Sequence, residues 1–154
     1  MRLRGNASIV EKNRLMGRRS RESGQAVVEL ALVLPIMLLL LVGIVQFGSV
    51  FRDYIALTDA TRAGARQGSV ARSLGGTDQA KIDSVVATVQ KAAVNLNVNN
   101  IGITVTPLKV DGTTTGWEQG GTVTVRTTYP FKLRLAGMVF FSGVVQSRTV
   151  ERVE

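Results

Sequence analysis

The residue best placed to do chemistry in this chain is Glu29, because it is the only acid between Glu22 and Asp53. The uncharged run Leu30–Val45 follows it, and with its apolar flanks this run reaches about 20 residues, enough for a helix to cross a hydrocarbon core. A carboxylate at mid-bilayer costs roughly 2.5–3.5 kcal/mol, and such residues commonly mark function. Glu29 therefore either meets a positive group of another chain or extends to the lipid headgroups.

The composition argues against an enzyme and against a metal site. The chain has no histidine and no cysteine, so the commonest general bases, thiol nucleophiles and transition-metal ligands are missing. Its outer acidic residues show no motif spacing, and no glycine-rich phosphate motif is present. These acids are Asp78, Asp83, Asp111, Glu118, Glu151 and Glu154. We therefore expect no catalytic residue, no metal and no cofactor.

Positive charge is concentrated at the start of the chain. Residues 1–24 carry seven basic and two acidic residues, which is +5 of the total net charge of +8. The positive-inside rule places this leader in the cytoplasm and the C-terminal part outside. The apolar run is longer than the core of a secretory signal peptide, and no small-residue cleavage site follows it closely. The nearly balanced remainder offers no basic patch, so we expect no nucleic-acid partner.

Residues 25–72 are predicted to form a transmembrane and stalk helix, preceded by a flexible leader over residues 1–24. Pro35 lies inside the apolar run, where it removes one backbone hydrogen bond and is expected to kink or loosen the helix. Further on, Ala60, Gly64 and Gly68 recur every four residues. Such a ridge of small residues lets another helix approach closely. We therefore interpret Pro35 and the ridge as helix-packing positions.

Residues 73–154 are predicted to form a small extracytoplasmic domain. The linker Ser73–Thr77 precedes a second helix that runs to about Asn95 and carries a one-sided apolar stripe, which we expect to pack on the chain's own sheet. Alternation over Ile101–Thr106 and Thr122–Tyr129 around a glycine-rich loop predicts a hairpin. The fold class is therefore α+β, with the long N-terminal helix, the second helix and a roughly three-stranded antiparallel sheet.

Three features of this outer domain complete the sequence prediction. Val144–Val153 is expected to form the last strand. Pro130–Phe141 is an apolar cluster too short and too charged to span a membrane, and it fits a core segment, an edge loop lying on lipid, or a subunit contact. Trp117 is expected to cover the small core, since a buried tryptophan contributes much apolar area.

The residues from Gly24 to Pro35 resemble the TadE-like minor pilins of the tight-adherence (Flp) pilus system. The shared element is G-Q-A-x-V-E-x-A-x-V-L-P, and the segment Asp59–Arg66 is also similar to the small-residue and arginine stretch of that family. Tyr129–Phe131 and Val150–Glu154 are similar as well, but less specific.

The resemblance implies a type IV pilin-like precursor, cut after Gly24 by a prepilin peptidase at the cytoplasmic face of the bacterial inner membrane. Gln25 would become the first residue and Glu29 the fifth. Leu30 stands where major Flp pilins often have an aromatic residue, which favours a minor pilin that acts in initiation or in tip or base assembly of an adhesive pilus. Implied partners are other minor and major pilins along the N-terminal helix, the inner-membrane assembly platform and the lipid bilayer.

The physical chemistry of Glu29 agrees with this interpretation. A freed α-amine is mostly protonated at neutral pH, and a carboxylate ~4 Å away gains about 4 kcal/mol at an effective dielectric constant near 20. That attraction is enough in scale to offset placing Glu29 in lipid, and it would favour one axial register between neighbouring helices. The alternative is an unprocessed single-pass membrane-anchored envelope protein whose outer domain binds a partner.

Overall fold

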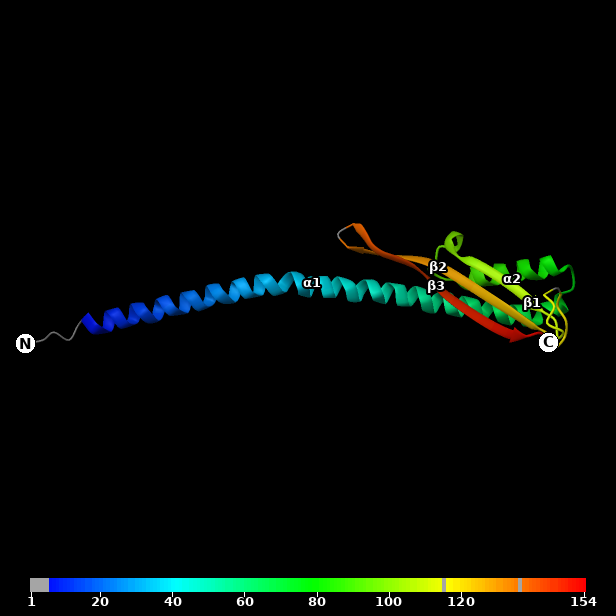
Figure 1. Ribbon diagram of the computed structural model, residues 1–154, viewed down its shortest axis with the longest axis horizontal. Coiled ribbons are helices and arrows are strands. Elements are labelled where there is room, and N and C mark those ends of the chain that lie inside the picture. The colour runs from blue at the N-terminus through cyan, green and yellow to red at the C-terminus, as the bar shows by residue number, and fades with distance from the viewer. Residues whose placement is uncertain (1–5, 115, 136) are drawn as a thin grey trace, which may run out of the picture. The chain divides into compact units, whose positions relative to one another are not determined.

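The computed structural model describes residues 6–114, 116–135 and 137–154, with side chains from Gly24 onward. Two helices precede a three-stranded antiparallel sheet (Figure 1), which confirms the predicted α+β class. The main elements are α1 (Asn6–Val70), α2 (Asp78–Ala92), β1 (Gly102–Leu108), β2 (Thr122–Leu135) and β3 (Met138–Arg152). Short 3-10 helices follow α1 at Ala71–Leu74 and precede β1 at Val98–Asn100.

The chain divides into two compact units, residues 1–45 and residues 46–154. The division falls where the apolar run ends, and α1 contributes residues to both units. The leader was expected to be flexible, but α1 begins at Asn6. The leader is rich in arginine and also contains glutamate, leucine and methionine, and such residues extend a helix that has already formed.

The second unit is built on a sheet with the order β1-β2-β3. Val125 of β2 is the register partner of both Val105 and Thr149, so the middle strand is paired along both edges. Pro130–Phe141, which the sequence left open, extends β2 and β3 into a long hairpin. Gly137 there has a φ of 85°, a left-handed conformation that glycine adopts without strain.

The core of this unit lies where the helices meet the middle strand. Leu57 of α1, Val85 and Val89 of α2, and Val123 and Val125 of β2 are fully buried. Thr77 caps α2 by accepting a hydrogen bond from the backbone N–H of Ala80. The apolar stripe of α2 therefore packs inside its own chain, as predicted.

Trp117 covers one end of this core, which confirms its predicted position. Its side chain is 8% exposed, and its Nε1 donates to the carbonyl oxygen of Gly68 at 2.7 Å. Lys81 belongs to α2, and its Nζ lies 5.9 Å from the centroid of the indole ring, a cation–π distance. The loop between β1 and β2 is thus fixed to both helices.

Candidate assembly segment in the first helix

The apolar run of the first unit is exposed along its whole length. No side chain between Gly24 and Val42 is buried, and Leu30 and Ile44 are 60% and 72% exposed. Exposed apolar surface of this extent needs a cover of lipid or of other chains. Among the described residues, α1 is long and apolar enough to cross a membrane, which agrees with membrane anchoring.

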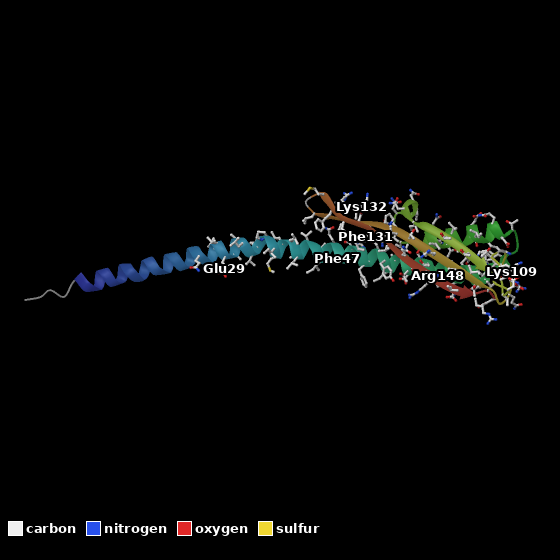
Figure 2. All side chains as sticks on the ribbon, in the orientation of Figure 1. Glu29, Phe47, Lys109, Phe131, Lys132 and Arg148 are labelled. Atoms are coloured by element: carbon white, nitrogen blue, oxygen red, sulfur yellow. The ribbon has the colours of Figure 1, made fainter. Side chains whose placement is uncertain are left out.

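Glu29 is exposed in the same unit, and Figure 2 labels it on α1. Among the side chains described from Gly24 onward, none forms an ion pair or a hydrogen bond with it. Its carboxylate therefore has no described neighbour in its own chain that balances its charge. A group of opposite charge from another molecule could occupy this position.

Two other predicted positions also lie in the first unit. A side chain added at Gly24 would meet nothing within 4 Å, so the backbone there is open. Gln25 is exposed beside it. The helix continues across Pro35, whose ring is exposed as well.

The small-residue ridge lies in the second unit, where the chain itself fills it. Ala60 is fully buried. A Cβ at Gly64 would lie 2.3 Å from Cγ2 of Val89 on α2, and a Cβ at Gly68 would lie 3.0 Å from the methyl carbons of Val123 on β2. The helix that approaches Gly64 so closely is thus α2 of the same chain.

The structure adds two polar pairs that sequence reasoning missed. Thr61 Oγ1 lies 2.6 Å from Thr127 Oγ1, with both residues fully buried, and joins α1 to β2. The backbone N–H of Arg134 donates to Oε1 of Gln46 at 2.6 Å, and Nε2 of Gln46 donates to the carbonyl oxygen of Arg134. The sequence could have drawn attention to Gln46, because it is the first polar residue after the apolar run.

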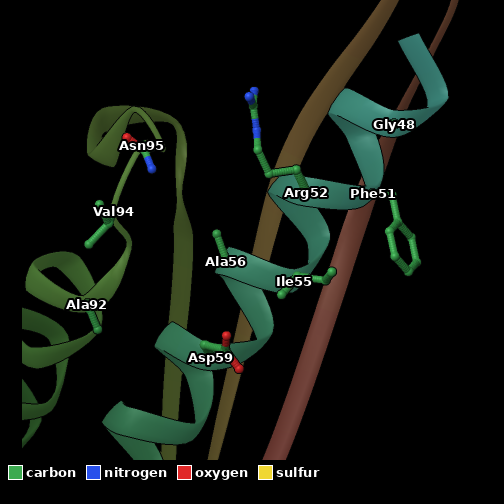
Figure 3. Close-up of a pocket in the computed structure, with 9 residues that line it drawn as sticks. All are labelled: Gly48, Phe51, Arg52, Ile55, Ala56, Asp59, Ala92, Val94 and Asn95. Carbon is green, nitrogen blue, oxygen red and sulfur yellow. The ribbon is translucent and has the colours of Figure 1, made fainter. Parts of the chain in front are cut away.

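A shallow groove separates α1 from the loop that follows α2 (Figure 3). Its α1 wall includes Arg52 and Asp59, and Val94 lies on the other side, while the ring of Phe51 points away from the loop. Oδ1 of Asp59 lies 3.6 Å from a guanidinium nitrogen of Arg62 and forms an ion pair with it, one helical turn further along α1. Most of the residues that line the groove are apolar, and Arg52, Asp59 and Asn95 are the polar ones.

The described residues contain no group of three or more acidic side chains that could hold a metal ion. In the loop after β1, the backbone N–H and the hydroxyl of Thr113 both donate to Asp111, which holds the pKa of that carboxyl below its ordinary value. This bond closes a turn of the loop.

Comparison with known proteins gives one family match. Residues 24–66 match the family model of the TadE-like proteins, which confirms the resemblance found in the sequence. The match covers 43 of the 154 residues, all of them in α1. The search of curated proteins and the search of solved structures each found no match.

Proposed function

We propose that the chain is a minor subunit of a Tad (Flp) pilus, made as a precursor that a prepilin peptidase cuts after Gly24. The observation that carries this proposal is the position of the family match, which begins at Gly24 itself. The match covers the exposed apolar run and the exposed Glu29. Cleavage at Gly24 makes Gln25 the first residue and places Glu29 one helical turn inside the mature helix.

Glu29 then pairs with the N-terminal amine of a neighbouring subunit. At ~4 Å and an effective dielectric constant near 20, this pair is worth about 4 kcal/mol. The cost of a carboxylate at mid-bilayer is roughly 2.5–3.5 kcal/mol. The pair therefore offsets the cost only after cleavage has freed the amine, which couples processing to assembly.

The contacts to other subunits come from the exposed side of α1. The ridge of small residues is already filled by α2 and β2, so it offers no surface to a neighbour. In the second unit α1 still exposes Phe47, Phe51 and Ile55, at 66%, 64% and 46%. These side chains continue the apolar surface beyond the membrane run and suit packing against other pilins. The outer unit of residues 46–154 suits a subunit that starts the pilus or caps its tip or base, held at the inner-membrane assembly platform.

Substitutions at Glu29 test the proposal. Glu29→Gln keeps the size of the side chain but removes its charge, and Glu29→Asp keeps the charge on a shorter side chain. In the native host we expect Glu29→Gln to enter the membrane as the unmodified chain does, measured by alkaline extraction. We expect its affinity for the other pilus subunits, measured by cross-linking, to fall by up to roughly a thousandfold. The affinity of Glu29→Asp should lie between those of Glu29→Gln and the unmodified chain. Normal cross-linking and normal pili with Glu29→Gln would reject charge pairing.

The groove between α1 and the loop after α2 favours a second candidate function. An anchored envelope protein that keeps its leader could bind a partner there, through Arg52, Asp59 and the apolar Val94. The two functions differ at Gly24, because only the pilin requires cleavage. Gly24→Leu should block maturation and pilus assembly if the first function is right, and should change nothing if the second is right.

A further inference from the structure

The far end of the β2–β3 hairpin exposes four consecutive apolar residues. The exposed fractions from Met138 to Phe141 are 73%, 51%, 83% and 56%. Met138 pairs with Leu135 and Val139 with Arg134, so the side chains of these two successive residues point to opposite faces. Both faces of this end therefore carry apolar side chains. Such a run is unfavourable in water unless something covers it. We propose that Met138–Phe141 inserts into the lipid interface of the membrane that holds α1.

The position of the hairpin in the second unit supports this. Val123 contacts Gly68, and Arg134 bonds Gln46, so β2 runs antiparallel to α1. The Arg134 bond therefore holds this end of the hairpin beside Gln46, the first residue of the second unit. Gln46 directly follows the apolar run in the sequence, so it lies close along the chain to the surface of a bilayer that this run spans.

Charge identifies the kind of surface. From Thr122 to Val150 the hairpin contains no acidic residue. Lys132 and Arg134 are exposed on β2 close to the apolar end, and Figure 2 labels Lys132 there. Basic residues beside an apolar insertion complement anionic lipid headgroups.

Lipid fits this end better than a second copy of the chain does. Two copies would bring their like charges together, which opposes association. The apolar side chains also lie on both faces of a two-stranded ribbon, so a flat partner would cover only one face. The ring centroids of Phe131 and Phe141 lie 6.0 Å apart, and the Phe131 ring lies against Gly143. These contacts join β2 to β3 near the apolar end. The inference needs α1 in a membrane but does not depend on pilus assembly.

A fluorescent label on the hairpin tests the inference, and the chain has no natural cysteine to interfere. Met138→Cys, labelled with a polarity-sensitive dye, is compared with Gln119→Cys, an exposed position in the loop before β2. The full-length variants are placed at low protein density in vesicles of phosphatidylcholine and phosphatidylglycerol. We expect a blue shift and strong quenching by shallow doxyl-labelled lipids at position 138, and neither at position 119.

Two further variants separate the contribution of the apolar side chains from that of the basic side chains. Adding Phe140→Ser and Phe141→Ser to Met138→Cys should reduce quenching to the level of position 119, with Trp117 emission as the check on folding. Lys132→Gln together with Arg134→Gln should reduce the dependence on phosphatidylglycerol. Equal, water-like signals at positions 138 and 119 would overturn the proposal. A blue shift without lipid quenching, which fades as protein density falls, would overturn it in favour of contact between copies.

Discussion

Replacing Gly64 with alanine should destabilise the outer unit, although alanine favours a helix more than glycine does. The new Cβ would lie 2.3 Å from Cγ2 of Val89, whereas carbon atoms in contact are normally ~3.5–4.0 Å apart. Val89 is fully buried, and a β-branched side chain in a helix has one strongly preferred rotamer. The conflict is therefore relieved only if α1 and α2 move apart.

The expected change in the free energy of unfolding follows from two opposing effects. Overpacking a core typically costs about 1–3 kcal/mol, and replacing glycine by alanine within a helix returns about 1 kcal/mol. With so short a contact, we expect a net loss of about 1–2 kcal/mol. Gly48→Ala is the matched control on α1, because a Cβ there meets nothing within 4 Å. It should stabilise the unit by up to about 1 kcal/mol.

Urea unfolding of the full chain in detergent micelles measures both variants. Trp117 is the single tryptophan and is buried at the end of the core, so its emission reports on this unit. In the double variant Gly64→Ala with Val89→Ala, the loss should be smaller than the sum of the single losses. If Gly64→Ala stabilised the chain as Gly48→Ala does, α2 would not fill the ridge, and the ridge would be open to another subunit.

Two further predictions concern the polar pairs. Thr61→Val should lower the free energy of unfolding by about 1–3 kcal/mol, because it removes the partner of the buried Thr127 hydroxyl. Adding Thr127→Val should restore part of this loss. Strictly additive losses would show that the two hydroxyls are not coupled. Gln46→Leu should raise the hydrogen exchange of the Arg134 amide roughly tenfold while the core stays protected. Unchanged exchange at Arg134 would mean that the pair does not form in solution.

Local patterns were enough to predict much of this fold. The apolar run is visible from its length and lack of charge. The stripe of α2 repeats with the period of a helix and the first two strands with the period of a strand, and these periods are visible without knowledge of the partner. Trp117 was assigned to the core from its size alone, and it is buried. Each of these predictions needed only neighbouring residues and their apolar character.

The features that the sequence could not give depend on distant pairing or on the identity of a partner. Gln46 and Arg134 are 88 positions apart, and their bond requires the strand register. The spacing of Gly64 and Gly68 indicates a close approach but not which element approaches. In Met138–Phe141 both faces are apolar, so the alternation that identifies a strand is lost and β3 was predicted to start later.

The mass of the mature chain in native membranes tests the central claim most directly. We predict a polypeptide that begins at Gln25 and lacks residues 1–24, because cleavage there frees the amine that pairs with Glu29 of a neighbour. A chain isolated from assembled pili with its leader still attached would contradict this account.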